Sequence, residues 1–374
     1  MRQWSRRRAR QGYIAAIKSS RQLRGSFYKP YSRVYHIAER QDWAIAWHAQ
    51  YISRHVRRLT GIPSSIVGTY HGISRQIVHF DSRAMYLNDA ADHINDSNRV
   101  VLYWTHGDKP DPKPNIRSLI DRLLGVYQRL SKIVTCSTIN EQRLLSWGIP
   151  EGMVTMIPIG VDVAAFRPTQ PSQRAKMRET MGIPSDAVCV GSFQKDGEGW
   201  GEGLEPKLEK GPDLFLEVIA KLAAEHKVFV LLTGPSRGYV KQGLDRIGVP
   251  YHHSFLRHFY DVIPYYQCLD LYMVASRDEG GPNSILESMA TGVPIITSRV
   301  GIAPQAIEQG KNGFIVDVGD TQGLADCASA LIRDSSLRSQ FAEGGLSMAR
   351  SFDWSVIAKQ YHEKVFAPLM IGSA

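Results

Sequence analysis

Short apolar runs alternate with longer amphipathic segments along the first half of this chain. The runs are of strand length and cover residues 34–38, 65–67, 76–80, 99–103, 132–135 and 155–157. An amphipathic helix with Trp43, Trp47, Tyr51 and Val56, capped by Asp42, is expected after the first run, and another over residues 116–130. Strands that alternate with helices in this way predict a parallel, doubly wound α/β sheet.

The second half repeats the pattern, with apolar runs at residues 187–190, 228–232, 269–275, 294–296 and 313–316. After Pro212, apolar residues recur on one face of a predicted helix. Residues 170–186 are largely polar and contain two prolines, so we expect part of a linker there. A chain of 374 residues is long for one hydrophobic core, and two such domains with ligand at the carboxyl ends of their strands are expected.

Two glutamates flank a glycine turn in the second half. Glu279 precedes Gly280-Gly-Pro, and Glu287 lies in the short helix that follows, which Asn283 or Ser284 can cap. Free N–H groups at such a turn suit a phosphate, so Gly281, Asn283 and Ser284 are candidate donor-binding residues and the carboxylates can reach the ligand's hydroxyls. This layout fits a sugar nucleotide. The alternative is a solvated Glu279 and a capping box between Ser284 and Glu287.

Further motifs accompany this pair in a fixed order. The Glu-x7-Glu spacing, the sequence GVPIITS at residues 292–298, NGFIV at 312–316 and IPIGVD at 157–162 resemble retaining GT-B glycosyltransferases of family 4 (group 1). The resemblance is strong over residues 130–320 and weaker before them. It implies two Rossmann-like domains that face each other across a cleft. The expected parts are a basic arm (1–32), an acceptor-side domain (33–165) joined by a C-terminal helix (354–366), and a donor-binding domain (166–353).

The resemblance also implies roles for individual residues. Lys210 lies just before a helix opened by Pro212, where a full charge and the helix dipole both attract a diphosphate. By resemblance, Lys210 binds the donor phosphates, Glu287 the ribose hydroxyls and Glu279 the sugar hydroxyls. His106 ends a predicted strand and is expected near the reacting sugar, so His106 and Glu279 are the catalytic candidates.

Two family features are absent from this sequence. The usual arginine after the first glycine of the second domain is replaced by Ser192 and Phe193, and we expect Lys195 to substitute for it. A glycine-rich segment follows at residues 197–203. One interpretation is that this segment forms a lid over the donor. The family's glycine loop after the first strand is also missing. Glu39, Arg40 and Trp43 stand in that region instead, and contact of these residues with the acceptor is one possibility.

Composition and charge limit the partners. No Asp-x-Asp and no histidine–carboxylate cluster at ligand spacing is present, so we expect no metal and no cofactor beyond the donor substrate. No membrane-spanning run or signal peptide is recognised, and the four cysteines show no metal-binding spacing, which predicts a cytoplasmic protein. Ten basic residues and no acid precede Glu39, whereas the remainder carries 35 basic and 36 acidic residues, or −1. We expect this arm either to contact the inner face of an anionic membrane or to form a loosely ordered start of the chain. Nucleic acid is not expected as a partner.

The sequence therefore predicts a retaining glycosyltransferase. It would move a sugar from a nucleotide-diphosphate donor to a glycan, lipid-linked or other hydroxyl acceptor in polysaccharide or glycoconjugate biosynthesis. The alternative is a non-catalytic, sugar-nucleotide-binding scaffold with the same fold, because a fold never guarantees an activity. The missing arginine and glycine loop favour the scaffold, whereas Glu279, Glu287, Lys210 and His106 favour the enzyme. The sugar, the nucleobase and the acceptor stay open.

Overall fold

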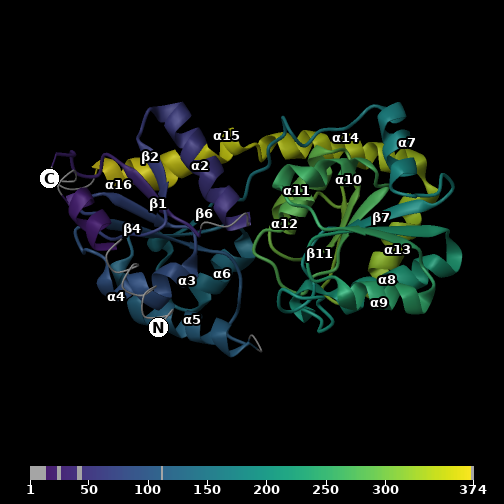
Figure 1. The fold of residues 1–374 in the computed structure, drawn as a ribbon, viewed down its shortest axis with the longest axis horizontal. Helices are drawn as coiled ribbons and strands as arrows, with labels where there is room; N and C mark the ends of the chain where they lie inside the picture. Colours follow the sequence, from purple (N-terminus) through teal and green to yellow (C-terminus); the bar gives the residue numbers. More distant parts are fainter. Residues whose placement is uncertain (1–13, 23–26, 40–43, 111–112, 372–374) are drawn as a thin grey trace. The chain divides into compact units, whose positions relative to one another are not determined.

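The chain forms two compact units, each built on one parallel sheet (Figure 1). The computed structural model describes residues 14–22, 27–39, 44–110 and 113–371. The N-terminal unit comprises Met1–Cys136, Asn140–Ile157 and Trp354–Ala374, and the C-terminal unit comprises Ser137–Ile139 and Pro158–Asp353. The prediction of an α/β fold with two parallel, doubly wound sheets is confirmed.

The sheet of the N-terminal unit has six strands in the order β2-β1-β3-β4-β5-β6, all parallel. The strands are β1 (Val34–Ile37), β2 (Ser64–Val67), β3 (Ile77–Phe80), β4 (Arg99–Trp104), β5 (Lys132–Thr135) and β6 (Val154–Met156). β3 is buried along its whole length, as expected for a parallel strand that is covered on both faces.

Helices surround this sheet. They include a helix over residues 14–22, α2 (Ala44–Thr60), α3 (Arg83–Met85), α4 (Ala91–His93), α5 (Pro114–Val126) and α6 (Thr138–Ser146), with a π-helical turn at Tyr86–Ala90. The predicted cap at Asp42 and the side chain of Trp43 lie outside the described residues. No helix in the described part of the chain is both long enough and apolar enough to cross a bilayer.

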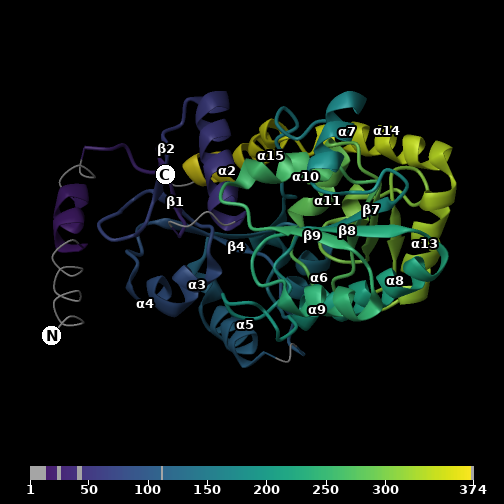
Figure 2. The same cartoon turned by 45° about the vertical axis from the view of Figure 1, so that its right-hand side comes forward.

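The end of the chain packs onto the N-terminal unit. α15 (Trp354–Tyr361) continues through a π-helical turn (His362–Phe366) into α16 (Ala367–Ile371). α15 runs beside α2 in both views (Figures 1 and 2). The rings of Tyr51 and Trp354 stack there, with centroids 4.9 Å apart and planes 4° from parallel. Residues separated by most of the sequence therefore share one hydrophobic core.

The sheet of the C-terminal unit also has six parallel strands, in the order β12-β11-β10-β7-β8-β9. The strands are β7 (Val188–Ser192), β8 (Val228–Thr233), β9 (Tyr251–Ser254), β10 (Leu271–Val274), β11 (Ile295–Ser298) and β12 (Phe314–Val316). The helices are α7 (Pro171–Thr180), α8 (Pro212–Glu225), α9 (Gly238–Ile247), α10 (Ile263–Gln267), α11 (Asn283–Ala290), α12 (Ala303–Ala306), α13 (Thr321–Arg333) and α14 (Ser335–Ser351). β10 and β7 lie at the centre, so ligand residues that follow them stand at the middle of the sheet edge.

The prediction of a linker over residues 170–186 was wrong, because this segment contains α7. The helix has no apolar stripe and is anchored by cations instead. Arg178 is buried, and its guanidinium donates to the Cys268 carbonyl and to Asp270, both at 2.9 Å. An ion pair that replaces apolar contacts leaves no hydrophobic periodicity, which is why the sequence pattern missed this helix.

We expect the ring stack between α15 and α2 to be a main source of stability in the N-terminal unit. Trp354→Ala should lower the free energy of unfolding by about 3–5 kcal/mol, because a large buried ring leaves a cavity. Val356→Ala on the same helix is the matched control, since Val356 is 40% exposed, and should change stability by less than about 0.5 kcal/mol. Urea denaturation measures both, and equal midpoints for the two variants would contradict the assignment.

Candidate functional site

Glu279 lies in the loop that follows β10 at the carboxyl edge of the C-terminal sheet. Its side chain is almost buried, and both carboxylate oxygens are engaged. Oε1 accepts a hydrogen bond from Ser276 Oγ at 3.0 Å, and Oε2 accepts one from Lys210 Nζ at 2.6 Å. The side chain of Lys210 is partly exposed. The structure therefore joins two of the predicted residues in one ion pair although they are 69 positions apart.

Gly211 is the reason that Lys210 reaches this loop. It has a left-handed backbone (φ 62°), and a Cβ atom at this position would lie 1.9 Å from the carbonyl oxygen of Ala275. Only glycine allows both the conformation and this close approach. The Glu209 carbonyl then accepts the N–H groups of Arg277 and Asp278, at 2.8 and 3.1 Å. The turn before α8 is thus fixed against the end of β10.

Glu287 lies in the second turn of α11 and is buried. Tyr266 donates its hydroxyl to Oε2 of Glu287 at 2.8 Å. Burial raises the pKa of Glu287 to about 7, although the Tyr266 hydrogen bond acts in the opposite direction. A buried carboxyl group with a pKa near neutrality is a typical mark of a binding or catalytic position.

The predicted cap of α11 was wrong. The helix begins at Asn283 with Pro282 in the cap position, and no side chain caps it. Pro282 takes an extended conformation, and the helix starts two residues earlier than a Ser284 cap requires. The alternative in which Glu287 only completes a capping box with Ser284 is therefore not what the structure shows. Asn283 and Ser284 stand in the first turn, and Gly281 precedes it.

Two buried tyrosines extend the contacts of Glu287, and the sequence analysis missed both. Ser284 hydrogen-bonds to Tyr272, and the hydroxyl of Tyr272 accepts the N–H of Phe193 at 2.8 Å. Burial raises the pKa of Tyr272 to about 12. The Phe193 ring meets those of Tyr266 and Tyr272 edge-on at 4.8 and 5.3 Å. Phe193 stands in the region where the family has an arginine. By packing against Tyr266, which hydrogen-bonds to Glu287, it helps to hold Glu287 in place.

Lys195 contacts an aromatic ring. Its ammonium lies 4.1 Å from the ring centre of Trp200, a cation–π geometry. Trp200 belongs to the glycine-rich segment 197–203, and this segment is anchored at several points. Ser236 Oγ donates to the carbonyls of Gly199 and Gly201 at 3.1 Å, and the N–H of Gly238 donates to Glu202 at 2.7 Å. These bonds argue against the lid interpretation, and the phosphate role of Lys195 stays a prediction.

Arg237 is a buried cation that the sequence analysis did not identify. It follows β8 and donates to the carbonyls of Ser192 at 2.7 Å and Thr233 at 3.0 Å. Its guanidinium also pairs with Asp196 at 2.9 Å. Burial raises the pKa of Asp196, and the positive charge of Arg237 acts against that shift. A positive charge therefore reaches the end of β7 from the neighbouring strand, next to the position where the family arginine is missing.

His106 belongs to the N-terminal unit, where it follows β4 at the carboxyl edge of the sheet. It is half-buried, and its backbone carbonyl accepts a hydrogen bond from Arg83. The Arg83 guanidinium stacks over Trp104 at 4.6 Å from the ring centre. The backbone at His106 is thus fixed by a neighbouring segment. The structure assembles Lys210, Glu279 and Glu287 in one unit and places His106 in the other.

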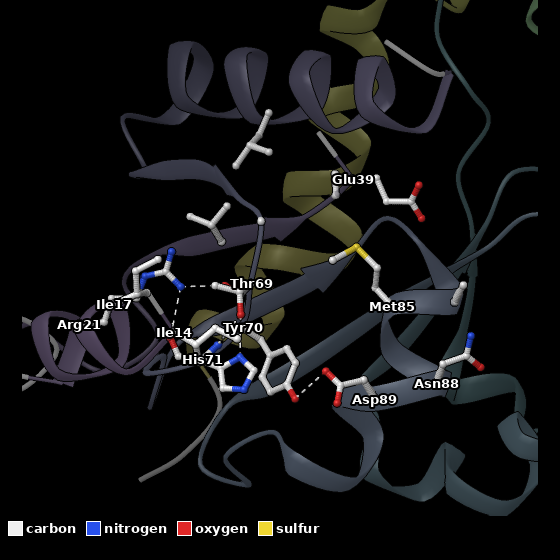
Figure 3. A pocket seen from close by; sticks show the side chains of 15 residues that line it. Ile14, Ile17, Arg21, Glu39, Thr69, Tyr70, His71, Met85, Asn88 and Asp89 are labelled. Carbon is white, nitrogen blue, oxygen red and sulfur yellow. Dashed lines mark hydrogen bonds between the residues drawn. The ribbon is translucent and has the colours of Figure 1, made fainter. Parts of the chain in front are cut away.

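A cavity of about 890 Å³ opens at the carboxyl ends of β1 and β2 in the N-terminal unit (Figure 3). Arg21 fixes one wall by donating to the carbonyls of Thr69 and His71, at 2.7 and 3.2 Å, and Tyr70 donates to Asp89 at 3.0 Å. The lining residues are Ile14, Ile17, Arg21, Ala38, Glu39, Ile66, Val67, Gly68, Thr69, Tyr70, His71, Ala84, Met85, Asn88 and Asp89. The wall is thus mixed apolar and acidic.

Several predicted contacts fall outside the described residues. Of the three residues considered for the acceptor, Glu39 lines this cavity, whereas Arg40 and Trp43 are not described. The arginines of the basic arm at positions 2, 6, 7, 8 and 10 also lie outside the described part.

The fold creates a cluster of histidines and a carboxylate that the spacing in the sequence did not indicate. The fold brings His36, His79 and Asp81 together in the interior of the N-terminal unit. His79 and Asp81 are close in sequence, but His36 comes from another strand, so spacing alone could not reveal the group. None of these residues belongs to the unit that carries Lys210, Glu279 and Glu287.

Known proteins resemble the chain at the level of sequence. A relative named D-inositol 3-phosphate glycosyltransferase from Corynebacterium jeikeium is 28% identical over 222 residues, which are 56% of this chain and 51% of the relative. A protein of the same name from Xylanimonas cellulosilytica is 27% identical over 271 residues, 67% of this chain and 60% of the relative. The chain thus spans about half the length of the curated relatives it matches.

Solved structures share the fold. A crystal structure of Anabaena Alr3699/HepE in complex with UDP and glucose has a TM-score of 0.72 at 18% identity, covering 90% of this chain and 100% of that one. WaaG, described as a glycosyltransferase involved in lipopolysaccharide biosynthesis, has a TM-score of 0.64 at 14% identity, covering 91% of this chain and 100% of that one.

A family model locates the resemblance on the chain. The model described as Glycosyl transferases group 1 matches residues 203–334, a segment that includes Lys210, Glu279 and Glu287. The motifs in residues 203–334 and the GT-B fold of the structural neighbours agree with this match. The resemblance predicted from the sequence is therefore confirmed: residues 203–334 match the model described as Glycosyl transferases group 1.

Proposed function

We propose that this protein transfers a sugar from a nucleotide-diphosphate donor to a hydroxyl group of an acceptor, with retention of the anomeric configuration. The observation that carries the proposal is the assembly of Lys210, Glu279 and Glu287 beside β10 and α11, within the segment that matches the family. The carboxyl edge of a doubly wound sheet is the usual place for a nucleotide ligand. The name of the sequence relatives and the bound UDP and glucose of the Anabaena neighbour support a sugar nucleotide as donor.

Each residue has a distinct task in this proposal. Lys210 is assigned to the diphosphate, because its ammonium is the cation fixed at the turn before α8. In a half-buried position its charge is worth more than in water, and it stabilises the negative charge that develops on the leaving group. Glu279, which holds Lys210 in place, is assigned to hydroxyls of the transferred sugar. Glu287 is assigned to the ribose hydroxyls.

The bond changes follow from retention without a covalent enzyme intermediate. The bond between the anomeric carbon and the diphosphate oxygen breaks, and the acceptor oxygen bonds to the same face of the sugar. The acceptor hydroxyl proton passes to the departing diphosphate. His106 is assigned to the reacting sugar, at the carboxyl edge of the other sheet. In this scheme Lys210 does the work that a metal performs in other transferases, so added Mg²⁺ should not strengthen donor binding.

The cavity in Figure 3 supports an acceptor that carries both hydroxyls and an apolar portion. Ile14, Ile17 and Ile66 offer apolar surface, whereas Glu39 and Asp89 offer carboxylate oxygens that accept hydrogen bonds from sugar hydroxyls. A glycan linked to a lipid has this combination. Synthesis of a polysaccharide or glycoconjugate is the process that uses such an acceptor.

A non-catalytic sugar-nucleotide binder is the second candidate. The observation in its favour is that Lys195 lies over Trp200 and Arg237 pairs with Asp196, so neither cation is committed to a phosphate. Slow hydrolysis of the donor without acceptor separates the two functions. Release of free sugar, lost in His106→Ala and Lys210→Ala, supports the enzyme. Tight donor binding with no hydrolysis and no transfer supports the scaffold.

Glu287→Gln should weaken donor binding about ten- to a hundredfold, because a charge-assisted hydrogen bond worth roughly 1.5–3 kcal/mol is lost. A thermal-shift panel of UDP-, GDP- and ADP-sugars first identifies the donor, since a bound ligand raises the melting temperature. Calorimetric titration of wild type and variant then measures the affinity. Glu308→Gln, at an exposed pair with Lys311, is the matched control. Unchanged affinity in a folded Glu287→Gln protein would defeat the assignment.

The raised pKa of Glu287 should make stability depend on pH. Between its ordinary value of 4.5 and about 7, the folded protein holds a proton on Glu287 that the unfolded chain has released. Stability from this group is therefore complete below pH 4.5 and decreases as pH rises to about 7, by on the order of 3 kcal/mol. Urea denaturation of wild type and Glu287→Gln at pH 5 and 7.5 tests this. The difference between the two proteins should change with pH, and a constant difference would contradict it.

The basic arm is proposed to bring the protein to an anionic membrane. Replacing Arg2, Arg6, Arg7, Arg8 and Arg10 by Gln in the full chain should strongly reduce sedimentation with vesicles that contain an anionic phospholipid. Each basic residue near such a surface contributes about 1 kcal/mol before salt screens it. Vesicles of neutral lipid are the control. Equal sedimentation of both proteins at low salt would remove this role.

A further inference from the structure

Three side chains with metal-binding atoms meet inside the N-terminal unit. His36 in β1 and His79 in β3 are paired in register, so their side chains leave the sheet on the same face. Asp81 comes two positions after His79 and shares that face. Each of the three side chains is fully buried. Parallel pairing and a spacing of two residues thus place two imidazoles and one carboxylate at one point.

The distances within this group fit a shared metal ion. Oδ2 of Asp81 lies 3.1 Å from Nδ1 of His36 and 3.1 Å from Nδ1 of His79. One potential ligand atom from each of the three residues lies within 4.8 Å of the other two. Ligand atoms around a tetrahedral Zn²⁺ with bonds of about 2.0–2.1 Å are separated by roughly 3.3 Å. Small shifts would bring the three atoms to bonding distance from one centre.

The hydrogen bonding of His79 is not satisfied within the protein. Nδ1 of His36 forms a hydrogen bond with Oδ2 of Asp81 at 3.1 Å. Nδ1 of His79 lies 3.1 Å from the same oxygen, yet neither ring nitrogen of this buried histidine has a hydrogen-bond partner. Leaving a buried polar atom without a partner costs about 1–3 kcal/mol. A nitrogen that lies near a carboxylate oxygen without a hydrogen bond between them is the arrangement expected when both atoms bind a common ion.

The charge of the group leads to the same conclusion. Asp81 is a buried acid whose ion-pair partners, among the described residues, are histidines rather than lysine or arginine. A divalent cation would compensate the carboxylate, and a buried charge without compensation is costly.

Outer contacts hold the ligands in place. Nδ1 of His48 lies 3.4 Å from the other oxygen of Asp81, and Tyr361 in α15 contacts Nε2 of His48 at 3.3 Å. The ring of Phe366 stands edge-on to those of His36 and His79, at 6.0 and 6.1 Å. Partners of this kind orient the ligands in known metal sites. Here they also connect the group to the C-terminal helices that cover it.

We propose that His36, His79 and Asp81 bind a divalent transition-metal ion, Zn²⁺ in the first instance, which stabilises the N-terminal unit under its C-terminal helices. Two imidazoles and one carboxylate suit Zn²⁺, Co²⁺ and Fe²⁺ better than Mg²⁺ or Ca²⁺. A water molecule or the second oxygen of Asp81 completes the coordination. The buried position assigns the ion a structural role, and it is separate from the metal-free donor chemistry proposed for the other unit.

Because the ligands are buried, the ion must enter while the chain folds. The test therefore refolds the full chain from denaturant with ZnCl₂, with CoCl₂ or with chelator, removes free metal by gel filtration, and measures bound metal by elemental analysis. We expect about one equivalent of Zn²⁺ or Co²⁺ per chain and a visible Co²⁺ spectrum of the tetrahedral type. The metal-loaded protein should melt at a higher temperature than the chelator-treated one.

Variants locate the ion. His79→Ala should lose the bound metal and the Co²⁺ spectrum, whereas His93→Ala, at a histidine whose side chain is 65% exposed, should keep both. If His79→Ala does not fold, wild type alone decides the matter through its metal content and Co²⁺ spectrum. Less than about a tenth of an equivalent in the refolded wild type would overturn the proposal. Equal metal content in a folded His79→Ala protein would overturn it as well.

Discussion

The approach of the Gly211 turn to the end of β10 is the constraint on which the donor site depends. A side chain at Gly211 would collide with the carbonyl of Ala275, so the turn can take this place only with glycine. The approach delivers Lys210 to Glu279 and ties the Glu209 carbonyl to the loop after β10. A long side chain on a free loop would lose considerable entropy on binding a phosphate. Here Lys210 loses most of that entropy when the protein folds, because Glu279 already holds its side chain.

Buried hydroxyls perform a similar task for the second glutamate. Tyr266 bonds to Glu287, and Tyr272 bonds to Ser284 and to the backbone of Phe193. The Phe193 ring packs edge-on against both tyrosine rings. The Glu287 carboxyl is thereby held in one orientation and kept out of water, which is what raises its pKa to about 7. Burial of the Glu287 carboxyl lowers the stability of the fold. It also strengthens a hydrogen bond between this carboxyl and a ligand hydroxyl, since hydrogen bonds are stronger where water is excluded.

The N-terminal unit uses polar groups differently. The cavity at the carboxyl ends of β1 and β2 combines apolar and acidic walls, whereas the interior of the unit holds three histidines around Asp81. The C-terminal helices close over this interior through the stack of Trp354 on Tyr51 and through Tyr361 and Phe366. The last part of the chain is therefore a structural element of the first domain and brings aromatic surface to its polar core.

The sequence by itself determined the fold class, eleven of the twelve strands in the described residues and the family resemblance of residues 203–334, because apolar runs and glycine turns act locally. It missed β9 (Tyr251–Ser254), whose residues are polar and half-buried, and α7, which is anchored by Arg178 rather than by an apolar stripe. Only the tertiary structure decided what each polar side chain contacts. Four contacts in the two units join separate strands or turns. They are the ion pair of Lys210 with Glu279, the hydrogen bond from Tyr266 to Glu287, the hydrogen bond from Arg237 to the Ser192 carbonyl, and the cluster of His36, His79 and Asp81. Such contacts depend on the order of strands in a sheet, and strand order leaves no periodic signal in the residues.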